Sequence, residues 1–284
     1  MKKTIFILIF SLTLTLLITP LVYSDSKNET IKEKNLHKKS ELSSITLNNL
    51  RHIYFFNEKG ISEKIMTEDQ FLDYTLLFKS FFISHSQYND LLVQFDSKET
   101  VNKFKGKQVD LYGSYYGFQC SGGKPNKTAC MYGGVTLHEN NQLYDTKKIP
   151  INLWIDSIRT VVPLDIVKTN KKKVTIQELD LQARYYLHKQ YNLYNPSTFD
   201  GKIQKGLIVF HTSKEPLVSY DLFNVIGQYP DKLLKIYQDN KIIESENMHI
   251  DIFIYKPNCI NKSTFGSVDL LKIRAEPTIK KSYT

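Results

Sequence analysis

The stretch from Lys171 to Tyr194 contains the most completely specified helix in the sequence, and the rest of the chain has to fold around it. Thr175 and Glu178 form an S/T-x-x-E capping box. In such a box the hydroxyl accepts from the third helical amide, and the carboxylate returns to the cap amide. Asn195-Pro196 opposes continuation of the helix. The pattern predicts a helix over 176–190.

Five apolar side chains recur at helical spacing along this segment and predict one dry face: Ile176, Leu179, Ala183, Tyr186 and Leu187. Val174, just before the cap, pairs with Leu179 as a hydrophobic staple. A helix with one dry face needs a sheet to cover it. β-branched and aromatic residues, clustered between turn signals, predict strands at 53–56, 70–78, 91–95, 108–116, 235–237 and 249–255. A shorter helix is expected at 40–49, with Leu42, Ile45 and Leu47 facing a core.

The N-terminus has the features of an export signal. Lys2-Lys3 precede an apolar run over 5–18, and Ser24 is a small residue at the end of the segment, with Val22 at the minus-three position. We therefore expect residues 1–24 to be removed and the mature chain to be secreted. A membrane anchor is the alternative, but the run is shorter than the ~20 residues that span a bilayer. Removal lowers the formal charge from +9 to +7, a modest excess that does not by itself indicate nucleic-acid binding.

Two motifs resemble the signatures of one toxin family. Lys171 to Tyr194 fits K-x2-V-x4-L-D-x3-R-x2-L-x5-L-Y, and Tyr132-Gly133-Gly134-Val135-Thr136 with Asn141 fits YGG[LIV]T-x4-N. Both are similar to the signatures of the staphylococcal and streptococcal pyrogenic toxins. The resemblance covers about residues 39–255 and is closest to the enterotoxin A-like branch.

This resemblance implies an α+β, mainly β fold with two domains. An N-terminal OB-fold barrel is expected over 51–143 and a C-terminal β-grasp domain with the long central helix over 144–255. Residues 25–50 are expected to supply a segment and helix that pack on the second domain. Residues 256–284 continue past the usual family end, as a disordered appendage or the product of a displaced stop codon, and they could cover the face of the last strand.

Cys120 and Cys130 enclose a hydrophilic loop, SGGKPNKTA, in a chain that is expected to be exported. In an oxidising compartment this spacing predicts a disulfide, which contributes ~2 to 3 kcal/mol in the chain-entropy model. A redox-active pair is disfavoured because the spacing is not C-x-x-C. Cys259 is the odd cysteine and is expected to be free or paired between molecules.

His249 and Asp251 alternate along NMHIDIFIY and so project from one face of a strand, while His211 ends another strand. Two imidazoles and a carboxylate suit zinc and leave a fourth tetrahedral position open. From the residues alone, a solvated strand face without metal is the more frequent interpretation. The resemblance implies instead that His211, His249 and Asp251 bind zinc. It also implies that the fourth ligand is a histidine on the β chain of an MHC class II molecule.

An open zinc can also activate water, so an enzyme has to be considered. His138-Glu139 is followed by Asn-Asn and does not continue as H-E-x-x-H, and no serine or cysteine lies in a recognisable nucleophile motif. We expect no enzymatic activity and regard His138 as a loop histidine. The basic cluster at 168–173 is interpreted as a solvated turn without interleaved aromatics, so nucleic acid is not an expected partner.

The resemblance implies two further contacts. Phe71, in the DQFL segment, corresponds to an exposed aromatic residue that contacts the MHC class II α chain, although a buried phenylalanine beginning a strand is the plain alternative. Asn49, in an expected turn, corresponds to a position that contacts the T-cell receptor β chain, the alternative being an ordinary turn residue.

The predicted function is that of a secreted enterotoxin superantigen that cross-links MHC class II to T-cell receptor Vβ, as a monomer or zinc-linked dimer without membrane insertion. The alternative is a superantigen-like immune-evasion module that binds host glycans or glycoproteins.

Overall fold

The computed structural model describes residues 35–56, 60–66, 74–79, 88–117, 120, 127–196, 203–212 and 218–257. The predicted signal peptide, Phe71 and Cys259 lie outside these ranges, as does all of the predicted tail except Lys256 and Pro257. Among the described helices, none combines the length and the apolar character needed to cross a membrane.

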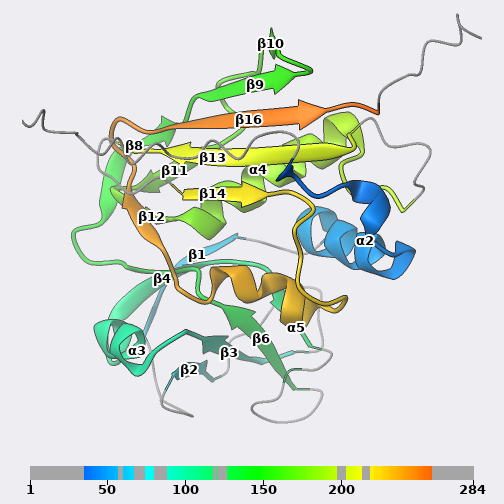
Figure 1. Cartoon of the computed structure of the whole chain (residues 1–284). Helices are drawn as coiled ribbons and strands as arrows, with labels where there is room; N and C mark the ends of the chain where they lie inside the picture. The colour runs from blue at the N-terminus through cyan, green and yellow to red at the C-terminus, as the bar shows by residue number, and fades with distance from the viewer. Residues whose placement is uncertain are drawn as a thin grey trace, which may run out of the picture.

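The lower half of the molecule in Figure 1 contains two small sheets and the helix α3. One sheet has the order β1-β4-β7 and the other β2-β3-β6-β5. Their bounds, with those of α3, are β1 (Gly60–Met66), β2 (Thr75–Phe78), β3 (Asp90–Gln94), α3 (Lys98–Phe104), β4 (Gln108–Tyr112), β5 (Tyr115–Tyr116), β6 (Thr128–Tyr132) and β7 (Val135–Leu137). Leu76, Val93, Val109 and Met131 lie in the shared buried core. The predicted barrel strands are therefore largely present.

The upper half holds a five-stranded sheet of order β10-β9-β16-β13-β14 (Figure 1). Its strands are β9 (Ile151–Ile155), β10 (Ile158–Thr160), β13 (Lys205–His211), β14 (Val218–Asp221) and β16 (His249–Tyr255). β16 pairs antiparallel with β13 and parallel with β9. Two short strand pairs join this half to the barrel: β8 (Gln142–Lys148) with β11 (Lys168–Lys171), and β12 (Lys173–Thr175) with β15 (Ile242–Glu244).

The central helix α4 spans Ile176–Tyr191, one residue longer than predicted. The Thr175 hydroxyl accepts from the Glu178 amide at 3.2 Å, as the capping box requires. The predicted return bond is wrong, because the Glu178 carboxylate instead accepts from Thr169 Oγ1 at 2.9 Å and Lys171 Nζ at 2.7 Å. Asn192, with φ 52°, ends the helix in the left-handed conformation, before Asn195-Pro196 is reached.

The basic cluster at 168–173 is not a solvated turn. Residues 168–171 form β11, and β12 begins at Lys173. The Lys171 side chain is only 2% exposed because its ammonium pairs with Glu178 inside the protein. Successive residues of β11 alternate between exposed and buried, and Lys171 is the one buried lysine among the four at 168–173.

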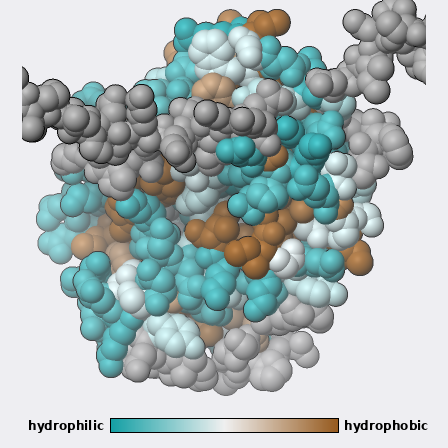
Figure 2. Space-filling view, in the orientation of Figure 1, coloured by the Kyte–Doolittle hydropathy of each residue, from teal (hydrophilic) through white to brown (hydrophobic). Residues whose placement is uncertain are grey.

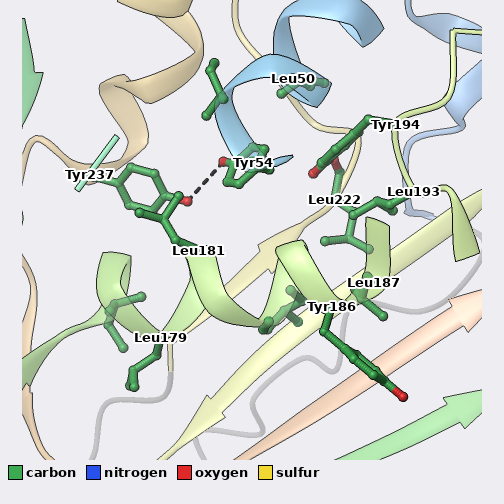
Figure 3. Close-up of a cluster of buried hydrophobic side chains, with 14 of the residues drawn as sticks. Leu50, Tyr54, Leu179, Leu181, Tyr186, Leu187, Leu193, Tyr194, Leu222 and Tyr237 are labelled. Carbon is green, nitrogen blue, oxygen red and sulfur yellow. Dashed lines mark hydrogen bonds between the residues drawn. The ribbon is translucent and has the colours of Figure 1, made fainter. Parts of the chain in front are cut away.

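The five residues predicted for the dry face of α4 are all buried, and burial extends beyond that face to nearly every side of the helix. Leu179, Ala183 and Leu187 are fully buried, and so are Asp180 and Leu181. Figure 3 shows Leu181 near Tyr54 and Tyr237, which come from segments far away in sequence. The five-stranded sheet covers one side of the helix, and helical turns of other segments cover the rest.

Two predicted strands are helical turns instead. Residues His52–Phe56 form the π-helix η3, and Leu234–Tyr237 form the 3-10 helix η4, which follows α5 (Pro230–Leu233). Tyr54 and Tyr237 are almost completely buried, and their hydroxyls lie 3.0 Å apart (Figure 3). The aromatic and β-branched residues that resembled strand sequence are present because these turns cover α4.

The first long helix, α2, spans Ser44–Arg51 and follows the 3-10 turn η2 (Lys39–Glu41). Ser43 caps α2 by accepting from the Thr46 amide at 3.1 Å. Leu47 and Leu50 are buried against the core that surrounds α4. Ile45 was predicted to face the core, but its side chain is 52% exposed, so this part of the prediction is wrong. The helix thus lies four residues later than expected at its start, with a rotated apolar face.

The Tyr132 to Asn141 motif lies where the barrel meets η4. Gly133 and Gly134 have φ 51° and 75°, a conformation that favours glycine, and a Cβ at Gly133 would collide with the Tyr237 carbonyl. The Asn240 side chain bonds both backbone groups of Val135 at 2.9 Å. The motif therefore stabilises the contact between the barrel and the segment at 237–240.

Candidate metal centre

Two neighbouring strands bring His211, His249 and Asp251 together. In the β13–β16 ladder His211 is paired with His249, and Val209 is paired with Asp251. The alternate residues Ile250, Ile252 and Ile254 are buried, so the odd-numbered residues of β16 face outward. The alternation predicted for β16 is confirmed, and the antiparallel register explains how His211 reaches the same face.

The three side chains form a compact cluster at the surface. His211 Nε2 lies 3.0 Å from Asp251 Oδ2, and His249 Nε2 lies 3.8 Å from Asp251 Oδ1. The two imidazole rings are parallel within 2°, with centroids 4.4 Å apart. The exposed fraction of the side chain is 31% for His211, 43% for His249 and 20% for Asp251, so the cluster opens to solvent.

The donor set fits a divalent cation with a preference for nitrogen and oxygen. One ligand atom from each residue can be chosen so that all three lie within 4.8 Å of one another. In a tetrahedral zinc site with bonds of ~2.0 to 2.1 Å, ligand atoms are about 3.4 Å apart, so small side-chain rotations suffice. Three protein ligands leave the fourth tetrahedral position open. A zinc ion held here would therefore bind one further ligand from outside the protein.

Two residues that sequence reasoning missed support the carboxylate. Asn152, on β9, is the parallel-strand partner of Asp251, and its Nδ2 donates to Asp251 Oδ1 at 2.8 Å. Arg159 Nη2 donates to Asn152 Oδ1 at 2.6 Å. Because a guanidinium only donates, it fixes the amide with its NH2 group toward Asp251. The Oδ2 atom of Asp251 is thereby directed toward His211. No local pattern indicates Asn152, because its contact depends on pairing across 99 residues.

The other predicted site residues have separate places in the structure. Asn49 lies in α2 and not in a turn, and its Nδ2 donates to the Gln228 carbonyl at 2.8 Å. Cys120 and Cys130 form the predicted disulfide, with Cα atoms 5.3 Å apart. His138 follows β7, and its Nδ1 lies 2.7 Å from Asp110 Oδ1. These residues are not part of the metal cluster.

Comparisons with known proteins match both halves of the chain. Residues 49–137 match the OB-fold domain of staphylococcal/streptococcal toxins, and residues 149–254 match their β-grasp domain. Enterotoxin type A of Staphylococcus aureus (strain MW2) is 64% identical over 255 residues, covering 90% of this chain and 99% of the relative.

Solved structures agree with these matches. Staphylococcal enterotoxin type A co-crystallised with zinc superposes with a TM-score of 0.76 at 65% identity, covering 78% of this chain and all of the other. The superantigen SpeA was solved in complex with a T-cell receptor β chain and soaked with zinc. It superposes with a TM-score of 0.69 at 31% identity, covering 78% of this chain and 97% of the other. The chain has the two-domain toxin architecture of an OB-fold barrel followed by a β-grasp domain, as predicted. It belongs to the staphylococcal/streptococcal toxin family, with enterotoxins among its relatives.

Proposed function

We propose that this chain is a secreted superantigen of the enterotoxin type, which bridges MHC class II on one cell to the T-cell receptor β chain on another. It would act without catalysis, by cross-linking the two receptors independently of the peptide that class II presents. The observation that carries the proposal is the surface cluster of His211, His249 and Asp251, which offers a metal with one open position. Its similarity to an enterotoxin co-crystallised with zinc supports zinc as that metal.

In this proposal the β-grasp domain holds zinc through the three side chains, and a histidine of the class II β chain completes the coordination. Such an arrangement makes one face of the molecule dependent on metal for binding. A second class II contact, to the α chain, is assigned to Phe71 on the resemblance. Alternatively, the zinc joins two copies of this chain. The predicted assembly state is therefore a monomer or a zinc-linked dimer.

The receptor side of the bridge is assigned to Asn49 and its surroundings. Asn49 is half-buried, and its bond to Gln228 joins α2 to the segment before α5. The relative that was solved with a T-cell receptor β chain supports the choice of partner. The domain division at 143/144 and export after residue 24 stay predictions that belong to the same proposal.

A T-cell proliferation assay with class II-bearing cells tests the proposal. The mature chain should cause broad expansion that is skewed toward particular Vβ families. Expansion should fall when Asp251→Ala or EDTA removes the zinc-dependent contact, while circular dichroism remains unchanged, because a two-domain core does not depend on the metal. If the chain causes no expansion at any dose but binds host glycoproteins, the immune-evasion alternative replaces this proposal.

A further inference from the structure

The outer face of the five-stranded sheet is arranged in rows. Odd-numbered residues of β16 face outward, and each row lies roughly 7 Å from the next along the strand. His249 and Asp251 provide the metal ligands of the first two rows, and Asp251 lies beside Asn152. In the following row Phe253 lies beside Trp154, and then comes Tyr255. The metal centre and an aromatic surface are therefore consecutive parts of one face.

Among the described residues, the segment 36–39 covers the β13 side of this face. Leu36, 4% exposed, packs on Leu207 and Val209 of β13 and reaches the edges of Phe253 and Tyr255. The His37 amide donates to Asp221 Oδ2 at 2.8 Å, and the Lys39 amide donates to the Gln204 carbonyl at 2.8 Å. Apolar residues on the β13 side are thus sealed by the chain itself. On the β9 side, the aromatic rings border an open pocket.

This pocket has a volume of about 300 Å³ and is lined by Trp154, Ser157, Phe253 and Tyr255. The Trp154 and Phe253 rings are nearly parallel, at 10°, with centroids 6.4 Å apart. At the rim, the turn of Asp156 and Ser157 is held in left-handed conformations with φ 48° and 71°. Figure 2 shows apolar side chains above this region, over β10, where Ile158 is 72% exposed.

Two backbone contacts fix the rim to β16. The Asp156 amide donates to the Ile254 carbonyl at 3.0 Å, and the Lys256 amide donates to Asp156 Oδ1 at 2.9 Å. The pocket is therefore formed by paired strands and an anchored turn, before any partner arrives. A preformed apolar recess lowers the ordering cost of binding, and it suits an inserted side chain.

Resting on the proposed function, we infer that this pocket receives an apolar side chain from the same partner segment that supplies the fourth zinc ligand. Strand addition is excluded on this face, because β9 and β16 are each paired on both edges. The pocket lies roughly 7 to 14 Å from the metal ligands along β16. The partner segment thus presents a histidine and an apolar side chain roughly 7 to 14 Å apart.

Binding of the full chain to immobilised class II, measured with zinc and with EDTA, tests this inference. Trp154→Ala should weaken the zinc-dependent binding by about tenfold or more, as truncation of a central aromatic contact typically does. Its zinc affinity, measured by competition with a chromophoric chelator, should stay within about twofold. Ser157→Asn keeps the aromatic packing, suits the left-handed backbone at this position and puts a polar amide into the pocket, so it should give the same loss even if Trp154→Ala lowers the melting temperature.

Tyr144→Ala is the matched control, because Tyr144 is fully exposed on β8, which belongs to a different sheet. It should leave class II binding unchanged. On the class II side, replacing an apolar residue that lies roughly 7 to 14 Å from the zinc-binding histidine should show coupling with Trp154 in double-mutant cycles. If the unmodified chain binds class II without regard to zinc, the proposed function fails. If its binding depends on zinc but neither pocket variant matters, only the present inference is overturned.

Discussion

Two carboxylates of this protein have similar partners but opposite surroundings. The Asp180 side chain, on α4, is completely buried, and it accepts from Arg184 Nε at 2.9 and 3.0 Å and from the Tyr237 hydroxyl at 2.6 Å. The Asp251 side chain is 20% exposed, with Asn152 on one oxygen and imidazole nitrogens beside it. The first carboxylate is enclosed by donors from the protein. The second is held firmly on one side and open on the other.

The difference shows what burial does to similar chemistry. Around Asp180, Arg184 also donates to the Tyr194 hydroxyl at 2.6 Å, and its guanidinium stacks 4.8 Å from the Tyr54 ring centre. A charge so deep in a core needs such partners, because an unpaired buried charge is very costly. Asp251 meets water and can exchange it for a metal. Asp180 and Arg184, in the Lys171 to Tyr194 motif, therefore hold the fold, whereas the candidate metal ligands lie outside both family-like motifs.

The largest expected effect comes from breaking the buried pair. Arg184→Met leaves Asp180 charged and without its main partner, so we expect the free energy of unfolding to fall by about 3 to 5 kcal/mol. Urea unfolding at neutral pH measures this. Lys103→Met is the matched control, because Lys103 and Glu99 have the same i,i+4 spacing on α3 but are 61% and 86% exposed, with 3.8 Å between their charged atoms. The control should change stability by less than about 0.5 kcal/mol. Equal losses in both variants would contradict the structural role given to burial.

A smaller effect is expected at the open carboxylate. Asn152→Ala removes the amide that orients Asp251, and loss of such a supporting hydrogen bond typically weakens metal binding by about 10- to 100-fold. Zinc titration against a chelator measures the change, and the melting temperature of the zinc-free protein should move little. Arg159→Gln, which can still donate to the Asn152 carbonyl oxygen, should have a weaker effect. Unaltered zinc affinity in Asn152→Ala would show that Asp251 does not need the Asn152 amide to reach its metal-binding orientation.

The smallest effect concerns alkaline pH. Burial raises the pKa of Tyr54, Tyr194 and Tyr237 above the ordinary value of 10.0, with Arg184 opposing the shift at all three. The folded state therefore keeps protons that the unfolded chain loses. The stability that these neutral hydroxyls contribute is intact below pH 10 and falls above it, by up to about 1.4 kcal/mol per pH unit for each tyrosine.

Unfolding at pH 9, 10 and 11 tests this in Tyr194→Phe. Removal of one ionisable hydroxyl should make the alkaline loss of stability shallower by up to about 1.4 kcal/mol per pH unit, although the variant starts lower at pH 9 without its bond to Arg184. Tyr144→Phe, at a fully exposed position, should keep the original slope. A Tyr194→Phe slope identical to that of the unmodified chain would place the alkaline sensitivity elsewhere.

Local signals in the sequence predicted the features that depend on local chemistry. The start of α4 at Thr175 and the outward projection of His249 and Asp251 follow from capping and from the two-residue strand period, and both are confirmed. The disulfide between Cys120 and Cys130 followed from spacing and expected export. The domain types rested on motif resemblance, because composition does not distinguish an OB-fold from other small barrels.

Features that depend on distant contacts were missed or misread. Tyr54 and Tyr237 resemble strand residues, yet they lie in helical turns because α4 needs aromatic cover on its far side. Lys171 resembles a solvent-facing lysine, but the Glu178 carboxylate draws it inside. Asn152 meets Asp251 only because β9 and β16 pair in parallel. In each case tertiary packing overrode the local preference.

The place of β16 in the sheet has a consequence for how the toxin is made. It is the last described strand in the chain, yet it lies between β9 and β13, whose edges stay unpaired until it arrives. Pairing across about a hundred residues is slow, because the loop-closure entropy must be overcome first. A chain interrupted before His249 would therefore carry two exposed strand edges and lack two of the three candidate metal ligands. The sheet can therefore close, and the candidate metal-binding face can form, only in a chain that has been synthesised through β16.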